Sequence, residues 1–414
     1  MQITRLLRNK AVTVSEMSRH AGELTAGRVA AREVVAIQDT SELVLGGRRA
    51  RAAGYGPVGK GGGLGGLLLH PVLAVEAGTG ALLGLVSMEV WNRTGGERVT
   101  GRRGRKTAQK ESQRWVAGAR QAGAVLAQAA SITVVSDRES DFYELFAQRP
   151  ANVNLVVRAC QNRRVEAPAP EMEDGLLFSI VDSQTEQGRF VVAIPAAPGR
   201  TARTAELAVR FMSVVLRRPR HGADRTLPET VALTLVDVRE SSQPSEGAPI
   251  HWRLLTTHAV ASLAQARRVV DLYRLRWTVE EYFRTIKTAG FDIEAADISD
   301  PRAMMNFVGA AAIAAVTIKQ LVQAREGTTD QRLSDAFDPD DQPVLEAVST
   351  RLEGKTARQR NPHPKGSLAF ATWVIARLGG WTGYYGKPGP QIMRRGLIEF
   401  RAIKYGTTLG LRDV

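Results

Sequence analysis

Three acidic residues occupy positions where a protein could bind a metal ion. Asp39 follows the short β-branched run 34–37, Asp137 follows a second such run at 132–135, and Glu280 lies in a segment with helical periodicity. In open sheets, sites collect at the carboxyl ends of strands, and carboxylate oxygens are the ligands that hard divalent cations prefer. Taken singly, Asp137 reads more readily as a loop acid and Glu280 as a solvated helix residue.

The residues around Glu280 favour a chemical role for that segment. Tyr273, Arg276, Glu280 and Lys287 stand at offsets 0, 3, 7 and 14. On a helix that turns about 100° per residue, these side chains share a stripe about 60° wide, and Glu281 lies off it. A glutamate on such a face can bind metal, while arginine and lysine can hold phosphates. The stripe therefore resembles the wall of an active site.

Composition limits the class of protein. The chain has 414 residues, and the single cysteine, Cys160, excludes a disulfide scaffold and a cysteine-rich zinc module. The N-terminus lacks the apolar core of a signal peptide. The longest apolar run, 307–318, falls short of the ~20 residues that a membrane-spanning helix needs, so we expect a buried core helix there. These features predict a cytosolic protein of two or three folded units.

The positive charge is concentrated in two places. Of the net charge of +14, residues 351–414 hold +9 (12 basic and 3 acidic residues), and residues 98–114 hold +6 (seven basic residues and Glu111). Coding bias explains the excess of arginine over lysine as well as phosphate binding does, but it does not explain the clustering. Localised positive charge predicts a polyanionic partner, most often nucleic acid.

The expected elements change character along the chain. Residues 34–160 alternate strands with helices, as in a mixed sheet covered by helices, and a short helix is expected after Ser140 as its N-cap. Residues 161–257 read as β-rich. Ser262 and Gln265 form a predicted capping box, from which a helix is expected to run to about Lys287. Beyond Pro301 the chain is predicted to be mainly helical.

The spacing Tyr-x2-Arg-x3-Glu-x6-Lys resembles the signature of a family of bacterial insertion-sequence transposases, the transposon-five transposase group. This group belongs to the DDE enzymes with an RNase H-like core. Further segments resemble the family in the same order, from about residue 34 to 300 and more loosely to Gly379-Gly380-Trp381: Ile37–Ser41, Lys110–Trp115, Ser136–Glu139, Leu155–Arg158, Trp252–Thr257 and Ser262–Tyr273.

The resemblance implies an α/β fold in which an RNase H-like mixed sheet is interrupted by a β-rich insertion and followed by a mainly helical C-terminal domain. The expected divisions are a short N-terminal remnant of an end-binding region, the first part of the core, the insertion, the second part of the core with the catalytic helix, and a basic C-terminal domain for dimerisation and DNA contact: 1–33, 34–160, 161–257, 258–300 and 301–414.

The resemblance also implies roles for single residues. Asp39, Asp137 and Glu280 would be catalytic and would bind two Mg²⁺ ions, with Mn²⁺ as a substitute. Four residues would contact phosphates near the transposon end: Tyr273, Arg276, Lys287 and Arg158. Trp252 would stack on a flipped base during a DNA-hairpin step, an interaction worth roughly 1–3 kcal/mol; on spacing alone it reads as a core residue of a strand.

The implied function is cut-and-paste DNA transposition. The enzyme would cleave at terminal inverted repeats and join the ends to target DNA, as a homodimer in a synaptic complex, in the bacterial cytoplasm at the nucleoid and without a membrane. One alternative is a truncated, inactive DNA-binding derivative that inhibits transposition by forming mixed dimers. A second is a metal-dependent nuclease with the same core. Family members carry a longer segment before the first aspartate, whereas 38 residues precede Asp39 here. A misplaced start, a truncation or a different mode of end recognition would each explain this.

Overall fold

The computed structural model describes residues 2–93, 111–166, 175–194, 201–220, 224–244 and 247–410. The chain is an α/β protein whose two compact units interleave in sequence. The first unit comprises 1–30, 40–97 and 278–414, and the second comprises 31–39 and 98–277. Most of the basic segment 98–114 lies outside the described residues.

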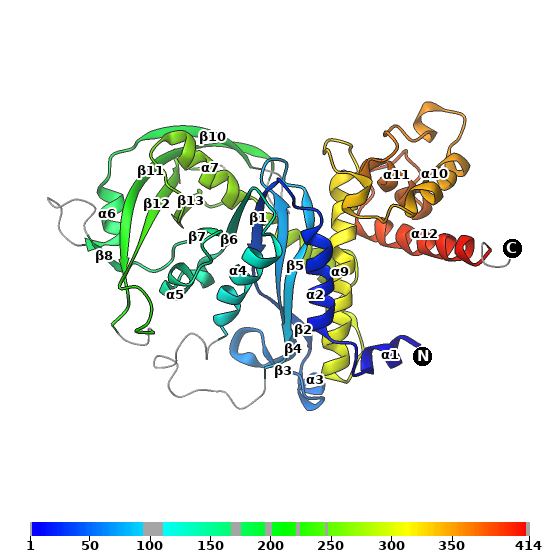
Figure 1. Cartoon of the computed structure of the whole chain (residues 1–414), viewed down its shortest axis with the longest axis horizontal. Helices are drawn as coiled ribbons and strands as arrows, with labels where there is room; N and C mark the ends of the chain where they lie inside the picture. The colour runs from blue at the N-terminus through cyan, green and yellow to red at the C-terminus, as the bar shows by residue number, and fades with distance from the viewer. Residues whose placement is uncertain are drawn as a thin grey trace. The chain divides into compact units, whose positions relative to one another are not determined.

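The second unit is built on a large mixed sheet (Figure 1). Three parallel strands come first, in the order β1 (Glu33–Gln38), β6 (Ser131–Ser136) and β7 (Asn154–Arg158). Antiparallel strands extend the sheet from β7, in the order β13 (His251–Thr256), β12 (Thr230–Glu240), β11 (Arg203–Arg217), β8 (Arg164–Glu166) and β9 (Gly175–Leu176), and β10 (Gly188–Ile194) pairs with β11. The β-branched runs at 34–37 and 132–135 lie within β1 and β6, and the strands from β8 to β13 fall in the region that was expected to be β-rich.

The parallel strands are buried along almost their whole length. In β1 and β6 every residue after the first is buried. Both faces of such strands are covered, which is why their sequences are continuous apolar runs rather than alternating ones. The covering helices include α4 (Gln113–Val125), against β1 and β6, and α7 (Leu263–Arg274), against β6 and β7. Two shorter helices, α5 (Tyr143–Ala147) and α6 (Leu177–Ser183), complete the unit with the 3-10 turn η3 (Arg138–Ser140).

The first unit contributes four antiparallel strands. The long strand β4 (Leu64–Glu76) pairs with β2 (Ser41–Gly46), β3 (Gly56–Val58) and β5 (Leu82–Trp91). The short elements α3 (Arg48–Ala52) and η1 (Lys60–Gly62) join these strands.

The N-terminal helices are part of this unit. They are α1 (Gln2–Arg8) and α2 (Val14–Ala26), and α2 packs on β5 and on α9 (Pro301–Ala324). The Thr25 hydroxyl of α2 donates to the Leu85 carbonyl at 2.8 Å. The Asn306 amide of α9 donates to the carbonyls of Leu7 and Val12, each at 2.9 Å. These contacts to β5 and α9 hold the first thirty residues in place.

Helix α9 is long and apolar enough to cross a membrane by length and composition alone. However, 61% of its most apolar window is buried inside the protein. This burial is the environment of a core helix, which agrees with the prediction for residues 307–318.

Three further helices form the C-terminal part of the first unit, as predicted beyond Pro301. They are α10 (Asp341–Leu352), α11 (Leu368–Leu378) and α12 (Pro390–Gly410), with short turns η5 (Ile293–Ala295), η6 (Leu333–Asp335) and η7 (Ala357–Gln359). A shared core includes Trp373, Phe370 and Leu345, and the rings of Phe337 and Phe400 meet edge to face at 5.8 Å. This core ties α9 to α11 and α12.

A glycine sets the closeness of α11 and α12, and this gives a first prediction. A Cβ added to Gly396 would lie 1.8 Å from the Ile375 carbonyl oxygen of α11. We expect Gly396→Ala to push the helices apart and cost about 1–3 kcal/mol, because overpacking forces backbone shifts. Thermal unfolding followed by circular dichroism measures this loss.

Gly406→Ala is the matched control on the same helix, since a Cβ there meets nothing within 4 Å. It should be neutral or stabilising, because alanine favours helix by about 1 kcal/mol over glycine. Equal melting temperatures for the two variants would contradict the importance of close packing at Gly396.

Two local predictions are wrong. The helix after Ser140 was expected to be capped by that residue, but Ser140 is buried at the end of η3 and its hydroxyl donates to the Asp137 carbonyl at 2.7 Å. The helix α5 instead begins after Phe142. A serine hydroxyl that bonds a nearby carbonyl stabilises a turn in place of the cap.

The helix expected to run continuously to Lys287 is also broken. Ser262 does cap α7, accepting the Gln265 N–H at 3.3 Å. At the helix end, however, the Arg276 N–H bonds the Tyr273 carbonyl, three residues back. A new helix, α8 (Trp277–Arg284), follows and passes into a π-helix, η4, at Thr285–Ala289. Tight and wide turns in one segment change the angle per residue, so the uniform 100° spacing does not hold and the single stripe was wrong.

Candidate active site

Asp39 and Asp137 follow neighbouring parallel strands at the same edge of the second unit's sheet. Strands β1 and β6 pair in parallel, with Ile37 opposite Val135. Each aspartate stands two residues beyond its member of that pair, and parallel strands lie about 4.8 Å apart. Asp39 and Asp137 come directly after the last strand residues, Gln38 and Ser136, and the Gln38 amide donates to the Trp115 carbonyl of α4 at 3.2 Å.

An arginine contacts the first of these carboxylates. Arg276 Nη1 donates to Asp39 Oδ2 at 2.9 Å, and the two side chains are 14% and 12% exposed. Arg276 is presented by the turn between α7 and α8. The guanidinium compensates the charge of a largely buried carboxylate, whose isolation would be costly. Arg276, predicted as a phosphate contact, is therefore placed directly beside a predicted metal ligand.

The loop that carries Asp137 is fixed by hydrogen bonds. Asp137 Oδ1 accepts the Glu139 N–H at 2.9 Å and so caps η3. Within the same loop, the buried Asp141 accepts the N–H groups of Cys160 and Gln161 at 2.7 and 2.8 Å. These bonds join the loop after β6 to the loop after β7. Asp137 is therefore held in a defined position while its side chain stays partly exposed.

Three predicted DNA-contacting residues lie close together in the second unit. The rings of Trp252 and Tyr273 meet edge to face, with centroids 5.5 Å apart. Arg158 on β7 donates to the His251 carbonyl of β13 at 3.2 Å, one residue before Trp252. Tyr273 is buried, whereas Trp252 is only partly buried. The indole is thus supported on one side by an aromatic ring.

The strand that bears Trp252 is held by an ionic cluster around Asp237 that the sequence analysis missed. Asp237 on β12 is fully buried. Its carboxylate lies 2.8 Å from His251 Nε2, 3.4 Å from Arg253 Nε and 2.9 Å from Arg239 Nε. His251 and Arg253 flank Trp252 in β13. An acidic residue inside an apolar strand was the available signal, but its partners become visible only with the strand register.

Glu280 and Lys287 belong to the first unit. Glu280 is exposed on α8, whose Val279, Tyr282 and Phe283 are buried. Lys287 lies in η4, and its ammonium donates to the Glu42 carbonyl at 2.6 Å. The same group lies 3.7 Å from Glu294. Lys287 is thus held against β2.

The donor chemistry of Asp39 and Asp137 fits a hard divalent cation. Both supply carboxylate oxygens from fixed strand ends, and such oxygens bind Mg²⁺ while leaving positions for water and phosphate oxygens. Among the described residues, no group of three or more His, Cys, Asp and Glu side chains is arranged to hold a metal ion.

A comparison with protein families settles the class. Residues 93–317 match the model of the transposase DDE domain, which covers more than half of the chain. The chain belongs to this family of transposases. Its members are metal-dependent enzymes that cleave DNA and transfer strands, and they bind DNA. The matched segment contains Asp137, Glu280 and all five predicted DNA contacts, whereas Asp39 lies before it.

Proposed function

We propose that this DDE transposase is a cut-and-paste enzyme with Asp39, Asp137 and Glu280 as its catalytic metal ligands. The observation that carries the proposal is the pair of aspartates at the ends of two adjacent parallel strands, in a chain of this family. The family implies an RNase H-like core, which we assign to residues 34–160 and 258–300, with 161–257 as the insertion and 301–414 as the basic C-terminal domain. The spacing around Glu280 supports membership of the transposon-five transposase group.

The metal ions, two Mg²⁺ or Mn²⁺, would activate the attacking oxygen and stabilise the leaving oxygen of the phosphodiester. The protein supplies position and charge. Asp39 and Asp137 would hold the cations at the sheet edge, and Arg276 would keep Asp39 oriented through the bond at 2.9 Å. The Arg276 guanidinium could also bind a phosphate through two donors.

The remaining site residues would handle the DNA end. Arg158, Tyr273 and Lys287 would contact phosphates, and Trp252 would stack on a base displaced from the duplex. Stacking offsets the cost of unstacking that base. The edge-to-face contact of Trp252 with Tyr273 supports this role, because an indole held at one edge keeps a fixed orientation. This step is the one that a hairpin intermediate requires.

The partners follow from this chemistry. The substrates would be double-stranded DNA with terminal inverted repeats and the target DNA, bound by a homodimer in a synaptic complex. Such an enzyme would work in the bacterial cytoplasm on the nucleoid, without a membrane. Helix α2 packs on β5 and α9, so the exposed face of residues 1–33 would be the part of this segment that contacts DNA.

The proposal is tested by supplying the full chain with DNA that bears the element's ends. We expect cleavage at the ends with Mg²⁺ or Mn²⁺, and none when the metal is removed with EDTA, because the carboxylates alone cannot activate water. Products on a denaturing gel report cleavage, and their hairpin form reports the Trp252 step. Metal-independent cleavage would sink the proposal.

The alternative is an inactive DNA-binding derivative that inhibits transposition. The concentration of charge, +9 in residues 351–414, favours DNA binding under either proposal. Specific binding to the ends, without cleavage in either metal, would favour the inhibitor. Cleavage without strand transfer would favour the nuclease.

A further inference from the structure

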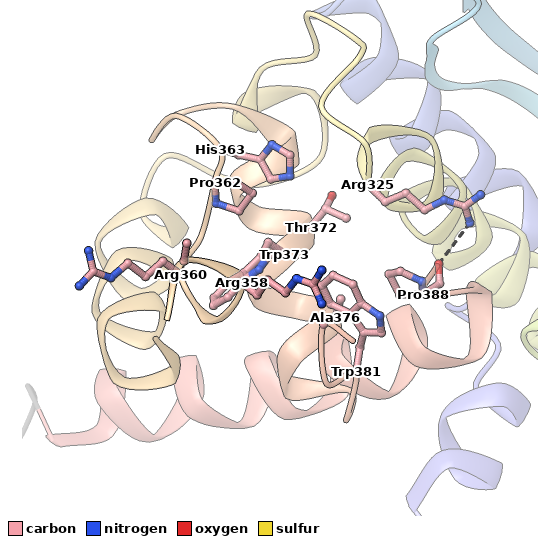
Figure 2. Close-up of a pocket in the computed structure, with 12 residues that line it drawn as sticks. Arg325, Arg358, Arg360, Pro362, His363, Thr372, Trp373, Ala376, Trp381 and Pro388 are labelled. Atoms are coloured by element: carbon pink, nitrogen blue, oxygen red, sulfur yellow. Dashed lines mark hydrogen bonds between the residues drawn. The ribbon is translucent and has the colours of Figure 1, made fainter. Parts of the chain in front are cut away.

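A cavity in the C-terminal part of the first unit carries features of a ligand site. Its volume is about 450 Å³, within the roughly 300–1,000 Å³ of pockets that hold small ligands. It is bounded by the end of α9, the turn η7, α11 and the loop that leads to α12. The lining includes three arginines, one histidine and two tryptophans: Arg325, Arg358, Arg360, His363, Trp373 and Trp381 (Figure 2).

The charge of this cavity is positive, since its lining, as far as the structure describes the chain, includes arginines and no aspartate or glutamate. Arg325 donates to the Pro388 carbonyl at 3.2 Å, and the adjacent Glu326 lies 3.7 Å from Arg325 Nε and is bound by Lys387 at 2.7 Å. Within the described part of the chain, the guanidiniums of Arg358 and Arg360 make no hydrogen bond or ion pair. In Figure 2 Arg358 extends toward Trp381, whereas Arg360 points away. Arg358 is therefore the cation best placed to meet an anion.

His363 does not add to this charge at neutral pH. Burial lowers the pKa of the imidazole below its ordinary value of 6.5. The neutral ring is a hydrogen-bonding and stacking surface rather than a cation. The anion would therefore be recognised by arginine, which binds phosphate oxygens in a planar, two-donor geometry.

The tryptophans supply an aromatic wall. Trp373 is buried in α11, and the Arg377 guanidinium lies 5.6 Å from the centre of its ring. Trp381 Nε1 donates to the Gly386 carbonyl at 3.1 Å, which fixes the indole in the loop. A purely apolar ligand would leave Arg358 without a partner, and a bare phosphate would not use the indoles. A ligand that joins an aromatic base to a phosphate uses both.

We propose that this cavity binds one nucleotide unit, a base with its phosphate. The unit can be a free nucleotide or a nucleotide splayed from a DNA strand, because both present the same chemistry. The base would stack against Trp381 and the phosphate would bind Arg358. This site is separate in the chain from the carboxylates at Asp39 and Asp137, and it does not depend on their assignment.

Binding can be measured with the full chain in EDTA, so that catalysis plays no part. The probes are dAMP, deoxyadenosine, inorganic phosphate and a short single-stranded oligonucleotide, with tryptophan fluorescence as the readout. We expect dAMP to bind more tightly than deoxyadenosine or phosphate. If the ligand is a nucleotide splayed from DNA, the oligonucleotide should displace dAMP and bind more tightly than dAMP. If the ligand is a free nucleotide, dAMP should bind more tightly than the oligonucleotide.

Arg358→Gln should weaken dAMP binding about tenfold, because a hydrogen bond to a charged group is lost. Trp381→Phe should weaken dAMP but leave phosphate unchanged. Arg401→Gln, an exposed arginine of α12 outside the cavity, removes the same charge and should leave dAMP binding unchanged; circular dichroism checks the fold of each variant.

Two results would overturn the proposal. The first is that the wild type and Arg358→Gln bind dAMP with equal affinity. The second is that an acidic peptide without aromatic residues binds the wild type as tightly as dAMP does. Neither outcome bears on end cleavage, since loss of metal-dependent cleavage in Glu280→Gln is measured separately. The failure of this site and the failure of the catalytic assignment are therefore distinguishable.

Discussion

Glu280→Gln is expected to lower metal-dependent cleavage at the DNA ends by about 10³-fold or more. If Glu280 is a metal ligand as proposed, the change would replace a charged ligand by a neutral amide of the same shape, and the metal that stabilises the reacting oxygens would be bound weakly or misplaced. A metal ion contributes several kcal/mol to such a transition state, and each 1.36 kcal/mol is tenfold in rate. The measurement is the single-turnover rate of end cleavage in Mg²⁺.

The fold should survive this substitution, because Glu280 is exposed on α8. Binding of end DNA, measured by mobility shift in EDTA, should be unchanged, which separates catalysis from binding. Glu399→Gln is the matched control: it makes the same chemical change at an exposed position of α12 and should cleave at the wild-type rate. Cleavage by Glu280→Gln at that same rate would remove Glu280 from the proposed site.

The same assay decides the place of Asp39, which lies before the segment matched to the family. Asp39→Asn should lose cleavage as Asp137→Asn does if both are metal ligands. Asp39→Asn also leaves Arg276 without its carboxylate partner. For this reason its melting temperature must be compared with that of Asp137→Asn before the two rates are compared.

The strand ends of the site could be predicted from sequence, but their pairing could not. The β-branched runs at 34–37 and 132–135 predict two buried strands, and both aspartates follow them directly. Nothing in the runs says that the strands are neighbours, because their hydrogen-bonding partners are backbone groups common to every residue. The contact of Asp39 with Arg276 joins positions 237 residues apart, and such pairings depend on the topology of the chain.

The break in the helix before Glu280 was invisible for a different reason. The segment 263–287 contains no proline or glycine, the residues that usually mark a break. The second irregularity, the π-helix η4 after Glu280, contains Thr285 and Thr288, whose hydroxyls bond the carbonyls of Glu281 and Arg284 at 3.0 and 3.3 Å. Such bonds compete with the regular helical pattern. Periodicity predicted one continuous helix, whereas the segment is divided into α7, α8 and η4.

Asp237→Ala is expected to be the most destabilising of the substitutions considered. The carboxylate is fully buried, and its removal would leave Arg239, Arg253 and His251 facing a cavity without their common anion. Breaking a buried ion pair costs about 3–5 kcal/mol. We expect the lower value, about 3 kcal/mol, because these side chains are 18–39% exposed and water can partly solvate them.

This loss should lower the melting temperature of the second unit by about 6–12 °C. Asp182→Ala is the matched control, since Asp182 contacts the same Arg239 and Arg253 but its side chain is 44% exposed. An exposed pair contributes less than about 1 kcal/mol. Equal melting temperatures would contradict a structural role for Asp237.

The same substitution should also affect Trp252, because His251 and Arg253 flank it. In Asp237→Ala these two residues lose their contact with Asp237, so the fluorescence of Trp252 should shift. Hairpin formation should fall as well, even at temperatures at which the variant is folded. The buried cluster would in this way support the base-stacking step that we propose for Trp252, without touching the DNA.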